Sequence, residues 1–245
     1  MTTGTEPLDQ ETRQKWQALV DTLTQISARH PDAVFASSLA AEDMVLSHAI
    51  FGAKLPIEIF TLDTGRLHPQ TLAMVDRIAE RYGVALRVVR PDAQAVQEHV
   101  AQHGEFGFYE SIELRKACCG IRKVEPLRRA LAGHSAWLTG QHRDQSVTRS
   151  ELAEAEYDHT FGLHKYNPLA SWTGAQIWAV IRAYGIPYNP LHDQGYPSIG
   201  CDPCTRAVRP GEHPRAGRWW WEQASSKECG LHQGNLASVK ETENG

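Results

Sequence analysis

Apolar residues recur at helical spacing near the start of the chain, where Trp16, Leu19 and Leu23 would lie on one face of a helix over residues 9–30. Short continuous apolar runs follow, and each has the length of one buried strand. Helical segments separate these runs. The predicted strands are residues 33–36, 57–62, 84–89 and 136–139, and the further predicted helices are residues 42–51, 69–82, 93–102 and 173–184.

Strands that alternate with helices predict an α/β fold, in which helices cover both faces of a parallel sheet. Ligands of such sheets bind beyond the carboxyl ends of the strands. Loops at these ends combine small residues with arginines, which suits a nucleotide with an anionic tail, whereas residues 151–158 are acidic and expected to be exposed. The candidate substrate-binding residues of the loops are Ser37, Ser38, Leu39, Thr64, Gly65, Arg66, Gly140 and Arg149.

The first of these loops, residues 37–41, allows two interpretations. Its backbone N–H groups and the start of the next helix could form a cradle for an anion. The same sequence is also typical of an ordinary helix whose first turn is capped by a serine. This segment alone does not decide between them.

Composition narrows the class of protein. Of 245 residues, 41% are hydrophobic and 22% are charged, as in a soluble globular protein with a full core. No stretch approaches the roughly twenty apolar residues of a membrane span. A net charge of −4 gives no general reason to expect nucleic-acid binding, so any anion site must be built locally.

The cysteines carry the most specific chemical signal. Four of the five form two pairs, the adjacent Cys118 and Cys119 and a distant Cys201-x-x-Cys204. The chain begins at Met1 without a recognisable signal peptide, so we expect a cytoplasmic protein with reduced thiols rather than two disulfides.

Three states of the four thiols remain open: a zinc site, a [4Fe–4S] cluster, or unligated core cysteines. Zinc would require the sulfurs to lie about 3.8 Å apart, whereas adjacent cysteines on a helix diverge by about 100°. A cubane cluster accepts a wider spread of thiolates. Lys123, four positions after Cys119, could offset the cluster's negative charge, while most other cations of that helix are expected to be solvated. Those cations are Lys116, Arg122, Arg128 and Arg129.

The segment from residue 207 onward is rich in Arg, Gly and Pro, and we expect a mobile tail. Arg215 and Arg218, three positions apart, could grip a phosphate or sulfate. The fifth cysteine, Cys229, precedes His232 by three positions, and cationic neighbours stabilise a thiolate. Cys229 could equally be an incidental tail thiol.

Six motifs together resemble those of assimilatory adenosine 5′-phosphosulfate (adenylyl-sulfate) reductases of the bacterial and plant type. They cover nearly all of residues 33–235, and the combination of Cys-Cys, Cys-x-x-Cys and Glu-Cys-Gly-Leu is highly specific. The motifs are SSLAAEDMVL (37–46), LDTGR (62–66), KACCGIRKVEPL (116–127), TGQHRDQ (139–145), IGCDPCTR (199–206) and GRWWWEQASSKECGLH (217–232).

The resemblance implies a fold like that of the ATP pyrophosphatases, the adenine nucleotide alpha hydrolase-like fold. It implies an N-terminal helix at 1–30, a nucleotide-binding domain at 31–206, and a tail at 207–245 that carries the nucleophile. By position, it also implies catalytic roles for Cys229, Lys123 and His232, and contacts to the phosphosulfate for Arg149, Arg215 and Arg218. The implied ligands of one [4Fe–4S] cluster per subunit are Cys118, Cys119, Cys201 and Cys204.

The implied activity is that of an oxidoreductase of sulfate assimilation and cysteine biosynthesis, which reduces adenosine 5′-phosphosulfate to sulfite and AMP. Cys229 would form an S-sulfocysteine that a small dithiol protein, thioredoxin or a glutaredoxin, then resolves. We expect neither a nucleic-acid nor a membrane partner, and a homo-oligomer remains open. The alternatives are a 3′-phosphoadenylyl-sulfate or dual-substrate reductase, a tRNA-thiolating ATP pyrophosphatase, whose Ser-Gly-Gly-like loop is absent here, and a structural iron–sulfur or zinc module.

Overall fold

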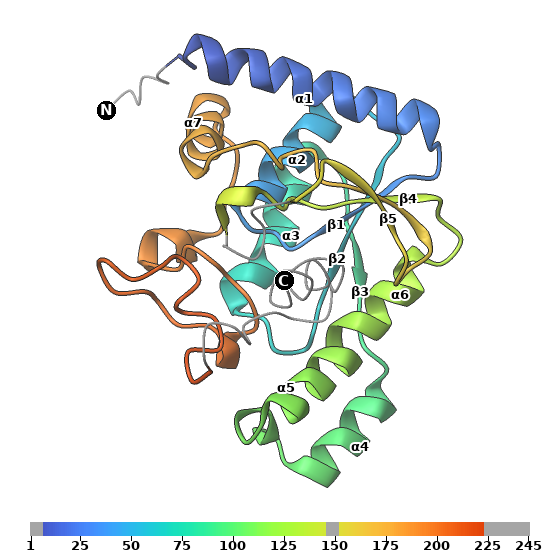
Figure 1. Ribbon diagram of the computed structural model, residues 1–245, viewed down its shortest axis with the longest axis vertical. Coiled ribbons are helices and arrows are strands. Elements are labelled where there is room, and N and C mark those ends of the chain that lie inside the picture. The colour runs from blue at the N-terminus through green and yellow to red at the C-terminus, as the bar shows by residue number, and fades with distance from the viewer. Residues whose placement is uncertain (1–6, 146–151, 223–245) are drawn as a thin grey trace, which may run out of the picture. The chain divides into compact units, whose positions relative to one another are not determined.

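A six-stranded, mostly parallel sheet with flanking helices organises the chain, which a computed structural model describes over residues 7–145 and 152–222 (Figure 1). The strand order is β3-β2-β1-β4-β6-β5. Strand β1 pairs in parallel with β2 and β4, β4 pairs in parallel with β6, and β5 is antiparallel to β6. The strands are β1 Val34–Ser37, β2 Glu58–Leu62, β3 Arg87–Val89, β4 Ala136–Leu138, β5 Ala155–Asp158 and β6 Leu163–Tyr166.

Local sequence signals place the helix ends. Asp9 accepts a hydrogen bond from the backbone N–H of Thr12 and begins the first helix, and Thr173 forms a capping box with Gln176 at the last. That last helix ends at Gly185, which has the left-handed conformation that favours glycine. The helices are α1 Gln10–Arg29, α2 Ala41–Gly52, α3 Pro69–Tyr82, α4 Ala93–His103, α5 Ile112–Cys119, α6 Glu125–Leu131 and α7 Gly174–Tyr184.

The predicted α/β fold is confirmed, with one correction. Residues 151–158 were expected to be acidic and exposed, and none of residues 155–158 is buried, but these four residues form strand β5, which pairs with β6 as a hairpin and was not predicted. An ion pair with one buried partner links the two strands of the hairpin. The side chain of Lys165 is 2% exposed and donates to Glu156 over 2.8 Å, so a charged residue takes a core position that apolar patterning does not reveal.

The chain forms two compact units, each assembled from separate stretches. Unit 1 comprises Met1–Thr61, Ala73–Arg87 and Gly133–Asn189, and unit 2 comprises Leu62–Leu72, Val88–Ala132 and Pro190–Gly245. The domain boundaries expected from the sequence, at residues 30 and 206, remain a prediction.

Unit 1 has an apolar core in which α1, α2 and α7 pack against one another. Leu23, Leu46 and Val180, one from each helix, are fully buried. Burial of each such side chain stabilises the fold by about 1.5–3 kcal/mol. This packing fixes the start of α2, which follows the first candidate loop.

Unit 2 contains a long helical rod and a stretch with little regular structure. Helix α5, a π-helical turn over Gly120–Val124 and helix α6 follow one another without a break (Figure 1). Short π-helical turns inside helices frequently occur at functional sites. The turn begins directly after Cys118 and Cys119, so the irregularity coincides with the first cysteine pair.

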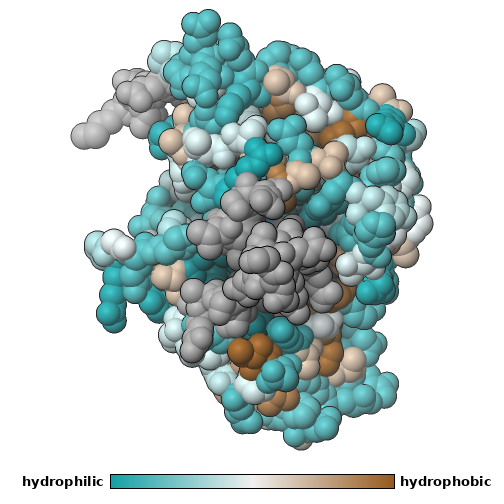
Figure 2. Space-filling model, viewed as in Figure 1, coloured by the Kyte–Doolittle hydropathy of each residue, from teal (hydrophilic) through white to brown (hydrophobic). Residues whose placement is uncertain are grey.

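The face of the molecule in Figure 2 is largely hydrophilic, with small separate hydrophobic patches. Single exposed apolar side chains are normal for a folded protein. Over residues 7–145 and 152–222, no helix combines the length and apolar character needed to cross a membrane. The large hydrophobic side chains exposed in the described part are Leu72, Val84, Phe106, Tyr109, Tyr157, Tyr184 and Trp220.

Candidate functional site

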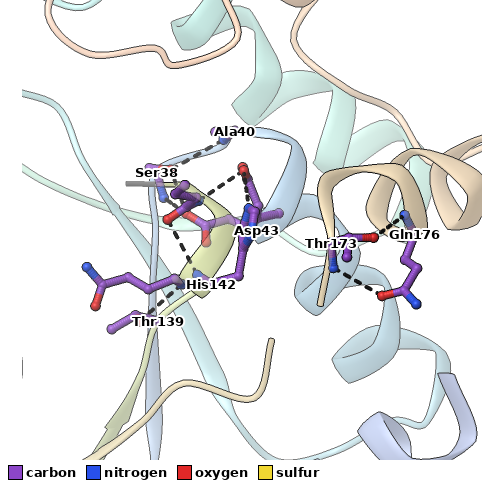
Figure 3. A network of polar contacts seen from close by, with 10 residues as sticks. Ser38, Ala40, Asp43, Thr139, His142, Thr173 and Gln176 are labelled. Carbon is purple, nitrogen blue, oxygen red and sulfur yellow. Dashed lines mark hydrogen bonds and ion pairs between the residues drawn. The ribbon is translucent and has the colours of Figure 1, made fainter. Parts of the chain in front are cut away.

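Two loops of unit 1, which we call the switch loops, follow the neighbouring strands β1 and β4: residues 37–41 and residues 139–145. The order of the sheet reverses between these two strands, and ligands of open α/β sheets bind at such a point. Asp43, in the first turn of α2, joins the loops (Figure 3). Its carboxylate accepts hydrogen bonds from the backbone N–H of Ser38 over 2.5 Å, from the Ser38 hydroxyl over 2.6 Å and from the backbone N–H of Gly140.

Gly140 makes this junction possible. A Cβ atom at position 140 would lie 1.9 Å from Oδ1 of Asp43, far closer than two unbonded atoms can approach. Only a residue without a side chain therefore lets the two loops meet through Asp43. The prediction that Gly140 belongs to the site had rested on its position after a strand, and the structure adds this steric reason.

The first switch loop does not begin α2 in the ordinary way. The N-cap residue of α2 is Ala40, and no side chain caps the helix, so the interpretation as a serine-capped helix is wrong. Ser38 donates to Asp43, and the Ser37 hydroxyl accepts from the backbone N–H of Leu39 over 3.2 Å. Leu39 is buried and has a φ of 63°, which is uncommon outside glycine and is typical of functional loops.

Two polar side chains of the second switch loop contact the first turn of α2, and a third polar side chain of the loop is buried. Oε1 of Glu42 lies 3.2 Å from Nε2 of His142 and accepts from the amide of Gln145 over 2.9 Å. Gln141 is 4% exposed, and within the described part of the chain neither amide atom of its side chain has a hydrogen-bond partner. A buried amide without partners is costly, so Gln141 is suited to meet a polar group of a ligand.

The pH dependence of stability tests the state of Asp43. Burial raises the pKa of Asp43 to about 6, although hydrogen bonds from Ser38 act in the opposite direction. Between pH 3.8, the ordinary pKa of the group, and about pH 6, the Asp43 carboxyl is therefore protonated more often in the folded protein than in the unfolded chain. The free energy of unfolding consequently falls as the pH rises through this range. We expect the free energy of unfolding, relative to that of an Asp43→Asn variant, to fall by up to about 3 kcal/mol from pH 4 to pH 7. Urea unfolding of both proteins measures it, and a difference that does not change with pH would contradict the raised pKa.

Unit 2 brings the two cysteine pairs together, in what we call the four-cysteine site. Burial raises the pKa of Cys204 to about 12, and the thiols of Cys201 and Cys119 add to this effect. Burial also raises the pKa of Cys118, again with a contribution from Cys201. Each pair thus lies within electrostatic range of the other, as expected from the sequence.

The four thiols are not joined by disulfides. The hydroxyl of Thr64 lies 3.2 Å from Sγ of Cys201, and an isolated antiparallel bridge pairs Leu67 with Cys201. The segment 62–66 after β2, predicted to bind substrate, therefore contacts the second cysteine pair within unit 2. Among the described residues, no three His, Cys, Asp or Glu side chains are spaced to hold a single metal ion.

Cations surround these thiols. Arg122, expected to be solvated, is instead 8% exposed; its guanidinium donates to the Thr64 carbonyl over 2.8 Å and interacts with Cys118. The charges of Lys123 and Arg218 act on Cys204 and oppose the rise of its pKa. A cationic environment of this kind stabilises thiolates, which is what a ligand set for iron requires.

Arg218 and a further arginine near the cysteines, Arg66, are held in place by aromatic and backbone groups. Arg218 stacks 4.7 Å from the ring centre of Trp219 and donates to the carbonyl of Ile199 over 3.2 Å. Arg66 lies over the rings of Phe106 and Phe108 and donates to the backbone of residue 105 over 2.6 Å. Such contacts fix guanidinium groups that would otherwise sample many rotamers.

The predicted site residues divide as follows. Cys229, His232 and Arg149 lie outside the described residues. Unit 1 holds Ser37, Ser38, Leu39 and Gly140, and unit 2 holds Thr64, Gly65, Arg66, Lys123, Arg215, Arg218 and the four paired cysteines.

Sequence reasoning missed Asp43, Gln141, Arg115 and Arg122. Asp43 resembles an ordinary acidic residue of a first helical turn. Arg115 precedes Cys119 by one helical turn, and that spacing is the one signal that could have drawn attention to it. Nothing local distinguishes Gln141 or Arg122 from exposed polar residues.

Comparison with known proteins gives a consistent result. A family model described as phosphoadenosine phosphosulfate reductase domain matches residues 32–207. A Burkholderia cepacia protein named adenosine 5′-phosphosulfate reductase is 60% identical over 92% of this chain and 90% of its own length. A protein of the same name from Allochromatium vinosum is 52% identical over 90% of this chain and 86% of its own.

Solved structures agree on the fold. A phosphoadenylyl-sulfate reductase from Candida auris has a TM-score of 0.66 and 28% identity, and the match covers 84% of this chain and 100% of that one. Yeast FAD synthetase has a TM-score of 0.60 at 14% identity over 84% of this chain and 71% of that one, which indicates a shared fold alone. The sheet order, the switch loops, the paired cysteines and these matches together lead to one conclusion: the chain belongs to the phosphoadenosine phosphosulfate reductase family.

Proposed function

We propose that this protein reduces adenosine 5′-phosphosulfate to sulfite and AMP in the cytoplasm, in sulfate assimilation. The observation that carries the proposal is the four-cysteine site, in which four thiols without disulfide bonds lie among cations, in a chain 60% identical to a reductase named for this substrate. A purely structural module would need neither the switch loops nor the fifth cysteine.

The switch loops are the proposed site for the nucleotide. Their position at the reversal of the strand order is where α/β sheets bind nucleotides, and Asp43 holds both loops in register. The buried amide of Gln141 supplies a donor and an acceptor for a polar group of the ligand. Ser37, Ser38 and Leu39 form the loop at this edge of the sheet, and Leu39 has a positive φ.

Cys118, Cys119, Cys201 and Cys204 would hold one [4Fe–4S] cluster. The donor set fits this group, because four thiols converge without disulfides and the cations Arg122 and Lys123 offset the negative charge of such a centre. When bound, the cluster would fix the two cysteine pairs and set the local field, and it would pass no electrons to the substrate.

The chemistry requires two thiol steps. The Cys229 thiolate attacks the sulfur of the phosphosulfate, the sulfur–oxygen bond breaks, and AMP leaves with the bonding electron pair, which leaves an S-sulfonate on Cys229. Lys123, His232 and the arginines at positions 149, 215 and 218 offset the charge that develops on the leaving phosphate. One thiolate of a dithiol protein, thioredoxin or a glutaredoxin, then attacks Cys229 and releases sulfite. The second thiol resolves the mixed disulfide, so the partner is oxidised and the Cys229 thiolate is regenerated.

Single turnover without a reductant tests the proposal. Stoichiometric protein and adenosine 5′-phosphosulfate should yield one AMP per chain and one sulfonate mapped to Cys229 by peptide mass spectrometry, and reduced thioredoxin should release it as sulfite. The 3′-phosphorylated substrate should react far more slowly. No AMP release would refute the proposal, and equal rates would assign the protein to the dual-substrate alternative.

Metal analysis tests the cofactor separately. We expect the anaerobically purified protein to be brown and to contain about four irons per chain. A Cys204→Ser variant should lose most of this iron, because an alcohol is a poor ligand for iron in such clusters. A colourless protein with a single zinc ion would contradict the cluster.

A further inference from the structure

A buried ion pair lies within unit 2 beside the first cysteine pair. Arg115, on α5, is 0% exposed and forms a two-pronged pair with Glu222, with Nε–Oε1 and Nη2–Oε2 distances of 2.7 and 2.9 Å. The side chain of Glu222 is 4% exposed. Trp219 stacks on the guanidinium, whose central carbon lies 4.6 Å from the ring centre. The carboxylate and the indole together hold the guanidinium in one orientation.

The same guanidinium reaches a cysteine. Cys119 follows Arg115 by four positions on α5, so the two side chains share one face of the helix, and Arg115 hydrogen-bonds Cys119. A guanidinium carries several N–H donors in a rigid fork, so it can bind a carboxylate and a sulfur at the same time. Arg115 therefore links Glu222 to a proposed ligand of the cluster.

The ion pair differs in charge from the other cations of the four-cysteine site. Those cations act on Cys118 and Cys204, and their charges oppose the rise of the pKa of both thiols. The charge of Arg115 is offset by Glu222 at a distance of 2.7 Å, so the pair as a whole is neutral. What Arg115 offers Cys119 is therefore mainly a directed hydrogen bond. A buried ion pair seldom stabilises a fold more than apolar side chains of similar volume, so stability alone does not account for this pair.

We propose that Arg115 is a positioning residue for the iron–sulfur site: its hydrogen bond holds the sulfur of Cys119 in the orientation that a metal centre needs and tunes the electron-donor strength of this ligand. Glu222 fixes the guanidinium for that task. The inference rests on the proposed cofactor and deepens it, because hydrogen bonds to the ligand sulfurs tune such clusters. Partners that orient metal ligands in this way typically contribute about 10–100-fold to metal affinity.

A charge-neutral double variant, Arg115→Met/Glu222→Met, is the sharpest test. It removes the hydrogen bond to Cys119 and leaves the net charge near the thiols unchanged, and apolar replacement of a buried pair is often neutral for stability. We expect loss of iron to a chelator, measured without oxygen, to be about tenfold faster than in the wild-type protein. The sulfur-to-iron charge-transfer absorption of the loaded protein should move to longer wavelength, because a hydrogen bond lowers the energy of the sulfur electrons.

Arg115→Lys is the conservative variant. It retains the positive charge but lacks the planar fork, so it cannot serve Cys119 and Glu222 with the geometry of arginine. We expect its rate of iron loss and its absorption maximum to lie between those of the wild-type protein and the double variant. A merely structural role of the pair would change the melting temperature and leave the absorption maximum of the loaded protein where it is, and that result would overturn the inference.

Arg206→Met/Glu212→Met is the matched control. Arg206 forms a similar two-pronged pair with Glu212 in the same unit, with distances of 2.8 and 3.0 Å, and also donates to the carbonyl of Ala207, so none of the described side-chain contacts of Arg206 is to a cysteine. This control should hold iron like the wild-type protein and absorb at the same wavelength.

Equal changes in the control and in the double variant would overturn the inference, as would a double variant that keeps the iron and the absorption of the wild-type protein. A wild-type protein that binds zinc or no metal would refute the proposed cofactor and this inference with it. Release of AMP in single turnover tests the proposed activity independently, so failure of the activity and failure of the inference remain distinguishable.

Discussion

Replacement of Cys229 by serine is expected to lower turnover of adenosine 5′-phosphosulfate by at least about 10⁴-fold, because removal of a covalent nucleophile abolishes the chemical step. A serine hydroxyl is nearly isosteric with the thiol but is scarcely ionised at neutral pH. Steady-state sulfite release with excess thioredoxin measures the loss. Binding of the substrate should be unchanged within about threefold, since the proposed nucleotide site lies in the switch loops.

The serine variant also distinguishes a nucleophile from a residue that only resolves an adduct formed elsewhere. After incubation with substrate labelled in the sulfonate group, wild-type protein should retain label that thioredoxin removes, and Cys229→Ser should retain none. Label that persists in the variant, at position 229 or on Cys118 or Cys204, would show that another group accepts the sulfonate.

Gly140→Ala is expected to weaken binding of adenosine 5′-phosphosulfate at least about 100-fold. The new methyl group would lie 1.9 Å from Oδ1 of Asp43, so either the carboxylate or the loop after β4 must move. Either movement breaks the hydrogen bonds by which Asp43 joins the switch loops. Overpacking of this kind also destabilises a fold by about 1–3 kcal/mol. Isothermal titration calorimetry measures the affinity, and urea unfolding measures the stability.

Gly52→Ala is the control for this change. Gly52 ends α2 in the same unit, and no atom lies within 4 Å of a Cβ built there. The control should bind substrate like the wild-type protein. Unchanged binding in Gly140→Ala would mean that the junction at Asp43 does not shape the nucleotide site. The same conclusion would follow if the loss of binding were no larger than the fraction of Gly140→Ala protein that is unfolded.

Elements whose ends are marked by particular residues were predictable from the sequence. The predicted helix 69–82 is the observed α3, because proline at its first position has a favourable φ and lacks only an N–H that would have no partner. The hairpin of β5 and β6 was not predictable. Its inward positions include Lys165, whose burial depends on a pairing with Glu156 that only the folded sheet creates.

The site was predictable where chemistry requires particular residues. Paired cysteines have few uses, so their convergence followed from their spacing before any coordinates. Arg115 and Arg122 have no such signature, because the groups that bury them, Glu222 and the Thr64 carbonyl, lie 107 and 58 positions away in the chain. Long-range partners of this kind decide which of several similar cations leaves the solvent, and a local pattern does not contain them.

The π-helical turn at Gly120–Val124 has a consequence for how the rod can tolerate change in length. Such a turn behaves as an α-helix that contains one extra residue, so the stretches before and after it are out of phase by about 100°. Helix α6 uses its phase to bury Leu127 and Leu131, while α5 uses a different phase to aim Arg115 and Cys119 at the thiol centre. Deletion of a single residue here would yield a more regular helix but a less stable protein, because α5 and α6 could no longer both face the groups that they contact now.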